Sequence, residues 1–173
     1  MSPHMLPFAA YLDAGYKIAL FLHIIAVVVA LGPTFGYGVF FSVLPRYPRA
    51  APALIEGMRR VDRYLVNPGM IILLIAGIFL LADSSIGGSN LWSGSDFFVV
   101  WGFIAIIALF GVQHGFFGPR MAQLQEFADR DLKSGDTFSA EFEASSKLIA
   151  QVGAATGILI VLTVFFMVYK PFM

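Results

Sequence analysis

The sequence predicts an all-α polytopic membrane protein built as a bundle of four transmembrane helices. Its 173 residues are 58% hydrophobic and 13% charged, with a mean hydropathy of +0.81. Soluble proteins carry about 25% charged residues. Four windows without Asp, Glu, Lys or Arg are each long enough to cross a bilayer, which needs roughly 20 helical residues. We therefore expect one transmembrane domain over residues 1–173.

The charge-free windows predict four spans. They cover approximately residues 17–43, 64–82, 97–118 and 147–169. Pro33 lies inside the first span and predicts a bend there, and prolines after Leu44 stop this helix. A helix then resumes near Ala53 and runs into span two, where Pro68 predicts a kink close to the membrane interface.

An amphipathic connector over residues 120–146 links spans three and four. It predicts a helix to about Leu132, a break at Ser134 and Gly135, and a new helix capped by Asp136 or Thr137. The first part of this connector either lies along the inner membrane surface or is a solvated helix.

Lys and Arg are concentrated in the connections after span one and between spans three and four, whereas the loop over residues 83–96 has neither. The positive-inside tendency places the two basic connections in the cytoplasm, and both termini and the loop over residues 83–96 outside. The N-terminus lacks the basic region and apolar core of a signal peptide, so the first span is expected to stay in the mature protein.

Composition also excludes several function classes. Without cysteine, the chain has no thiolate metal site, Cys nucleophile or covalently attached haem. Zero net charge and the absence of a long basic run argue against nucleic acid as a partner. No phosphate-binding, zinc-protease or serine-hydrolase motif occurs. The expected partner is the lipid bilayer, with a membrane-protein partner or a homo-oligomer as further candidates.

His23 in span one is the first candidate functional residue, because an isolated imidazole in hydrocarbon is costly and normally has a partner. It shares a helical face with small residues, Ala26 and Ala30, which leave a shallow groove. The groove either admits a porphyrin edge, with His23 as the haem-iron ligand, or admits a neighbouring helix to which His23 hydrogen-bonds.

His114 near the inner end of span three is the second candidate cofactor ligand. Helix geometry places His23 and His114 at different depths, so one iron cannot bind both. A haem would then need another axial ligand, Met70 or Met167, or an open coordination site.

Polar residues fall into two layers. The inner layer holds His114, Gln113, Asn67, Met70 and Gln151, and the outer layer holds His23, Trp101, Thr163 and Met167. These groups either satisfy one another between helices or mark two ends of a cofactor site, a quinone site or a proton route.

Small residues predict close helix packing at two G-x-x-x-G pairs, Gly32 with Gly36 and Gly153 with Gly157. The second pair is expected to face another helix, and Ile160 to face lipid. Similar segments, GVFFSVLPR in span one and GFFGPR in span three, indicate a two-fold internal repeat of helix pairs.

The chain resembles a bacterial family of predicted four-span integral membrane proteins of unknown function. The resemblance rests on LFLHIIAVVVALG, RRVDRYLVNPGMIILLIAGIFLL, FFGPRM and FMVYKP, over nearly the whole chain. The opening Leu22-His23 segment is also similar to HemJ-type and CopD-type membrane proteins, although Ala30 stands where those families commonly have tryptophan. This second resemblance implies His23 as a haem-iron ligand and nothing more.

These observations predict a multi-pass protein of the bacterial inner membrane whose specific role is b-type haem binding or another redox-associated function at His23. The first alternative is a non-enzymatic accessory or assembly subunit of a membrane complex. The second is a small-solute carrier. Whether the protein is an enzyme stays open at this stage.

Overall fold

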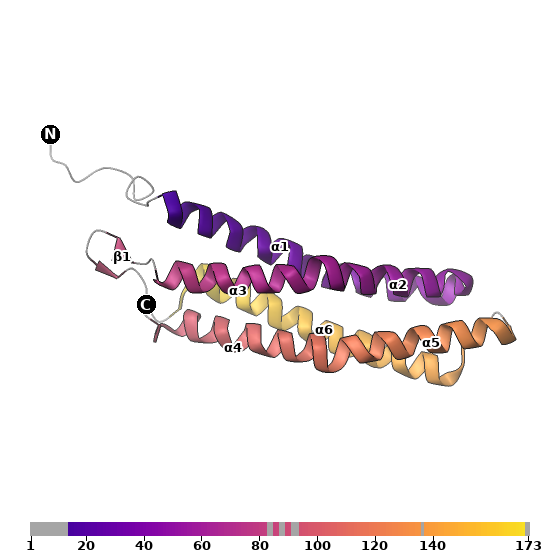
Figure 1. Cartoon of the computed structure of the whole chain (residues 1–173). Helices are drawn as coiled ribbons and strands as arrows, with labels where there is room; N and C mark the ends of the chain where they lie inside the picture. The colour runs from indigo at the N-terminus through magenta and orange to yellow at the C-terminus, as the bar shows by residue number, and fades with distance from the viewer. Residues whose placement is uncertain (1–13, 83–84, 87–88, 91–93, 136, 172–173) are drawn as a thin grey trace.

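A computed structural model of the chain describes residues 14–82, 85–86, 89–90, 94–135 and 137–171. Within them, four helical rods lie side by side (Figure 1). The rods comprise α1 (Ala14–Val43); α2 (Ala51–Val61), the π-helical turn η5 (Asp62–Val66) and α3 (Asn67–Ala82); α4 (Phe97–Val112), the π-helical turn η6 (Gln113–Phe117) and α5 (Gly118–Ser134); and α6 (Ala140–Tyr169).

Short elements connect the rods. Two 3₁₀ turns, η3 (Leu44–Arg46) and η4 (Pro48–Ala50), join α1 to α2. The two-residue strands β1 (Ser85–Ile86) and β2 (Ser89–Asn90) pair in antiparallel fashion between α3 and α4. All four rods are long and apolar enough to cross a membrane, which confirms the predicted four-helix membrane bundle.

The transmembrane half of the molecule runs from the two π-helical turns to the end that carries the β1–β2 connection (Figure 1). In each of the two rods that contain a π-turn, the turn and the helix on its transmembrane side together comprise 21 residues. These are residues 62–82 for η5 with α3 and residues 97–117 for α4 with η6. At 1.5 Å per residue each stretch is about 31 Å long, which matches the roughly 30 Å hydrocarbon core. Large apolar side chains are exposed along this half, among them Ile75, Ile104 and Val168.

Each π-helical turn is followed by a proline, Pro68 after η5 and Pro119 after η6. Proline lacks a backbone N–H, and its ring clashes with the carbonyl four residues earlier. A local change to π-helical bonding accommodates such an interruption within a continuous rod. The irregularity predicted at Pro68 therefore takes the form of a π-turn just before it.

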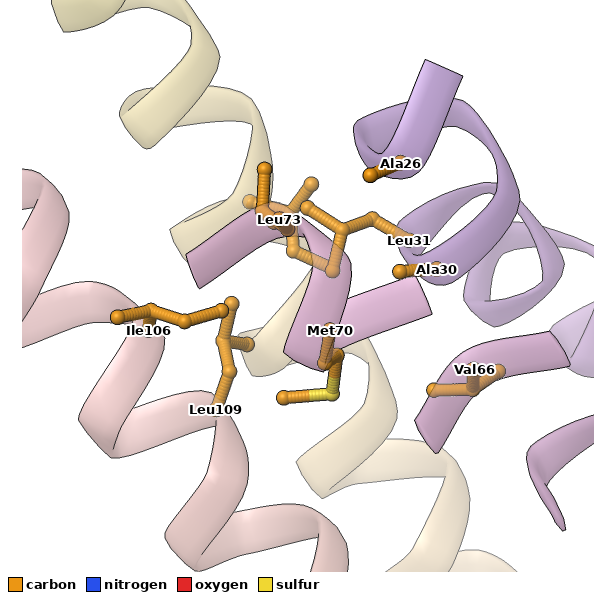
Figure 2. Packing of buried hydrophobic residues seen from close by; sticks show 9 residues of the cluster. Ala26, Ala30, Leu31, Val66, Met70, Leu73, Ile106 and Leu109 are labelled. Atoms are coloured by element: carbon orange, nitrogen blue, oxygen red, sulfur yellow. The ribbon is translucent and has the colours of Figure 1, made fainter. Parts of the chain in front are cut away.

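The core of the transmembrane half is formed by α1, α3, α4 and α6. Figure 2 shows Leu31 of α1 and Ile106 and Leu109 of α4 directed toward α3, where Met70 and Leu73 lie. A Cβ atom added at Gly69 would lie 3.0 Å from Cβ of Ala30, which is fully buried. The backbones of α1 and α3 therefore approach closely at this point.

This close approach corrects two sequence predictions. The groove at Ala26 and Ala30 is filled by α3, so its interpretation as a porphyrin slot is wrong. The Gly32 and Gly36 pair does not mediate helix packing, because a Cβ atom added at either position would meet no atom of another helix within 4 Å. Alanines on the opposite stripe of α1 make the contact instead.

Ile160 is buried, with 3% of its surface exposed, so the prediction that it faces lipid is wrong. It follows Gly153 and Gly157 at helical spacing and therefore shares their inward stripe. That stripe does face other helices as predicted: Gly157 lies against Phe35 of α1, and Gly153 lies near Phe117 of η6.

Beyond the π-turns, α2, α5 and the first turns of α6 form a second apolar core outside the transmembrane half. Its fully buried members include Leu44, Ile55 and Leu124. The first part of the connector, α5, thus continues the rod of α4 and buries one face against α2 and α6 (Figure 1). The alternative in which it lies along the membrane surface is wrong, because its apolar stripe is covered by protein.

The connector breaks at Gly135, as predicted, but α6 begins later than expected. Ser139 is the N-cap, and its hydroxyl accepts a hydrogen bond from the backbone N–H of Phe142 at 3.3 Å. The backbone N–H of Ser139 in turn donates to the buried carboxylate of Asp131 at 2.8 Å. This bond ties the end of α5 to the start of α6. Among the predicted caps, Thr137 is not the N-cap, and Asp136 lies outside the described residues.

The four rods form two hairpins, α1 with α3 and α4 with α6, and the start of α1 and the end of α6 lie at the same end of the bundle (Figure 1). The two similar segments differ in structure. Leu44–Arg46 forms the 3₁₀ turn after α1, whereas Gly118–Arg120 continues a helix. The internal repeat stays a prediction.

Candidate functional site: two cavities in the helix bundle

The outer cavity lies between α1, α3, α4 and α6 and has a volume of about 640 Å³. Its walls are mainly apolar side chains such as Val27, Leu74 and Phe103. His23, Thr163, Met167 and Lys170 also line it. Three of the four members of the predicted outer polar layer therefore share one space.

His23 is held in place by α3. Its Nδ1 lies 3.2 Å from the backbone carbonyl oxygen of Leu73, and its ring edge would lie 3.3 Å from a Cβ atom added at Gly77. A carbonyl only accepts hydrogen bonds, so Nδ1 carries the proton and donates it. Nε2 of the neutral ring then carries a lone pair. The predicted polar partner of His23 exists, and it leaves the second ring nitrogen for another interaction.

Thr163, Trp101 and Met167 complete the outer layer. The indole N–H of Trp101 donates to the Thr163 hydroxyl at 3.1 Å, and this hydroxyl donates to the Leu159 carbonyl at 2.8 Å. The methyl group of Met167 occupies the space that a side chain at Gly102 would need. Glycine at this position thus lets the Met167 thioether pack inside the bundle.

Lys170 follows α6 and lies at the edge of the outer cavity, with its ammonium 5.3 Å from the centroid of the Phe98 ring. Partial burial lowers the pKa of the Lys170 ammonium. The outer cavity therefore carries a basic group at the outer end of the bundle and an imidazole deeper within it.

His114 does not line either of the two cavities described here. It is exposed in η6, where its Nδ1 donates to the Phe110 carbonyl at 3.2 Å and its ring stacks on Phe110. His23 and His114 lie at different depths, as predicted, because His23 contacts the middle of α3 whereas His114 belongs to the π-turn at the inner boundary.

The inner cavity, of about 490 Å³, lies between α1, η5, η6 and α6. Tyr37 of α1, Asp62 of η5 and Gln113 of η6 line it, together with the hydroxyl side chains of Thr34 and Thr156. The Tyr37 hydroxyl lies 2.7 Å from a carboxylate oxygen of Asp62 and 3.2 Å from the Met58 carbonyl. Asp62 also accepts a hydrogen bond from the side chain of Gln113.

The predicted inner layer is only partly assembled. Gln113 and Met70 line the inner cavity, whereas His114, Asn67 and Gln151 do not. Asp62 and Tyr37 are the residues that sequence reasoning missed, because Asp62 lies outside the charge-free window of span two. A signal was available: Asp62, Val66 and Met70 recur every four residues, so a carboxylate continues the buried stripe of that helix.

Comparison with known proteins supplies the family. Residues 17–171 match the family described as "Predicted integral membrane protein (DUF2269)". The chain belongs to this family. No curated protein and no solved structure matches it.

In this DUF2269 protein the two cavities are neighbours. Leu31 of α1 and Leu109 of α4, both labelled in Figure 2, line both of them. The described residues hold no group of three His, Asp or Glu side chains able to bind a bare metal ion. The polar groups of the outer cavity thus include an imidazole, a hydroxyl, a thioether and an ammonium on a mainly apolar wall.

Proposed function

We propose that this membrane protein binds haem b in its outer cavity, with Nε2 of His23 as an axial ligand of the iron. The observation that carries the proposal is the hydrogen bond from Nδ1 of His23 to the Leu73 carbonyl. Histidines that bind metals commonly donate their other ring N–H to a carbonyl, which fixes the tautomer and the ring orientation. The resemblance of the Leu22-His23 segment to HemJ-type and CopD-type proteins supports the same role.

The residues present fit this cofactor. Small-molecule and cofactor sites are usually cavities of about 300–1,000 Å³ with apolar walls and few polar groups, and the outer cavity has this character at about 640 Å³. Met167 and Lys170 also line this cavity, where they would supply a thioether ligand for the iron and a cation for a propionate. When bound, haem b would supply one-electron redox chemistry. The protein's own part would be to hold the ligands and exclude water.

The same proposal includes a location. We infer a bacterial inner membrane, with both termini and the outer cavity on the periplasmic side, from the basic residues near the opposite end of the bundle. The lipid-exposed apolar surface of the transmembrane half agrees with an integral position.

An absorbance spectrum of the purified protein tests the haem proposal. We expect a Soret band that persists through purification and disappears in His23→Ala and His23→Gln, while His114→Ala retains it as the matched control. Met167→Leu should change the spin state of the iron, because it removes the other axial ligand. A well-folded, colourless wild-type protein that also fails to bind added haemin would refute the proposal.

A second candidate is a non-enzymatic accessory or assembly subunit of a membrane complex. It is favoured by the same His23 bond, because an imidazole that joins α1 to α3 is also a means of fixing helix packing. The absorbance spectrum distinguishes the two candidates, because an accessory subunit would fold without a bound chromophore.

A further inference from the structure

The inner cavity contains a carboxylate without a charged partner among the described residues. Asp62 forms no salt bridge in the part of the chain that the structure describes, and its hydrogen-bond donors Tyr37 and Gln113 are both neutral. Two neutral donors hold the carboxylate in position but leave its negative charge uncompensated. An ionisable residue of this kind in a transmembrane bundle indicates a functional site.

The arginines near Asp62 in the sequence point elsewhere. Arg59 donates to Gln125 of α5, and Arg60 pairs with Glu56 at 2.7 Å. Arg63 is exposed, and its guanidinium carbon lies 5.8 Å from the centroid of the Tyr64 ring. Three cations are thus within one helical turn along the chain, yet the carboxylate of Asp62 faces the cavity.

The rest of the cavity wall suits an organic cation. Rings from Phe35, Tyr37, Phe41 and Phe117 line it together with aliphatic side chains. Aromatic faces attract cations, and the attraction is stronger where water is excluded. A single carboxylate among apolar groups matches one positive charge carried on an apolar body.

The local backbone brings these groups together. Asp62 opens the π-turn η5, and Gln113 opens the π-turn η6 of the neighbouring rod. π-turns are rare and often found at functional sites, because the extra residue redirects a side chain. Gly153 and Gly157 also line the cavity, and the absence of side chains there lets the rings of Phe117 and Phe35 approach α6.

We propose that the inner cavity is a binding site for a lipophilic monovalent organic cation, with the Asp62 carboxylate as counter-ion and the surrounding aromatic rings as its apolar contact. The site is separate from the outer cavity and does not depend on haem. Tyr37 and Gln113 are positioning residues that hold the carboxylate.

Binding of tetraphenylphosphonium to the purified full-length protein in detergent, followed by isothermal titration calorimetry, tests this proposal. We expect saturable binding to wild type, and binding weaker by about tenfold or more in Asp62→Asn, which keeps the shape but removes the charge. Asp129→Asn is the matched control, because it removes an exposed carboxylate outside the cavity and should bind like wild type. Thermal unfolding of each variant checks that it is folded.

A neutral probe separates charge recognition from simple apolar binding. Triphenylphosphine oxide has a similar apolar body and no net charge, so it should bind more weakly than the cation and respond little to Asp62→Asn. Three results would overturn the proposal: no saturable binding of the cation to wild type, equal affinity in folded Asp62→Asn, or equal affinity of the neutral probe.

Discussion

At the scale of single residues, the environment of His23 decides how the sequence should be interpreted. Its Nδ1 bonds to the Leu73 carbonyl, and the alanines on its face pack against α3. Ala26 and Ala30 join α1 to α3, and the His23 side chain both bonds to α3 and lines the outer cavity.

The hydrogen bond of His23 predicts an order of stability among its variants. His23→Gln should be more stable than His23→Leu, because an amide can still donate to the Leu73 carbonyl, and the difference should be about 0.6 to 2 kcal/mol. Denaturant titration of the protein in mixed micelles measures it. Equal stability of the two variants would show that the bond contributes nothing to folding.

At the scale of helices, glycines differ sharply in what surrounds them. Gly69 touches Ala30 across the α1–α3 interface, whereas a Cβ atom added at Gly111 of α4 would meet nothing within 4 Å. The distribution of small residues in the sequence does not distinguish these two environments. Only the contacts of each helix face show which glycine allows a close approach.

Gly69→Ala should therefore destabilise the bundle by about 1 to 3 kcal/mol, because the new methyl group overlaps Cβ and the backbone of Ala30. Gly111→Ala is the matched control and should leave stability unchanged or raise it by up to about 1 kcal/mol, since alanine favours the helix. The midpoints of unfolding in the same micelles compare the two. If Gly69→Ala were as stable as Gly111→Ala, the interface would be looser than described.

At the scale of the whole molecule, the bundle has two unequal halves. The transmembrane half exposes apolar side chains and contains the outer cavity, and the other half buries a second core beneath charged surface residues. The inner cavity lies where the two halves meet, since Met121 and Ile149 of the second core help to line it. The two π-turns mark the boundary, with Arg63 and Arg120 close to it. The difference between the two halves, with basic residues at their boundary, predicts which end of the bundle faces the cytoplasm.

The orientation is tested by cysteine labelling in intact cells, which the absence of native cysteine makes straightforward. Ser89→Cys should react with an impermeant thiol reagent from the periplasmic side, and Ser134→Cys should react only after the membrane is permeabilised. The expectation follows from the basic residues near the Ser134 end. The opposite labelling pattern would invert the topology.

The sequence by itself determined the fold class, the four spans and that His23 would have a polar partner, although not which group this partner is. These follow from local quantities, the length of an apolar window and the cost of an unpaired imidazole in hydrocarbon, which need no knowledge of neighbouring helices. It also placed Gly153 and Gly157 on a helix-facing stripe, because helical spacing alone defines a stripe.

Only the tertiary structure decided which stripe faces which helix. The burial of Ile160, the filling of the Ala26–Ala30 groove by α3, and the meeting of Asp62 with Tyr37 and Gln113 depend on the rotation and depth of each rod. Those quantities are set by packing among four rods at once. In the sequence Asp62 lies just outside an apolar window, yet in the structure it opens the π-turn η5 and lines the inner cavity.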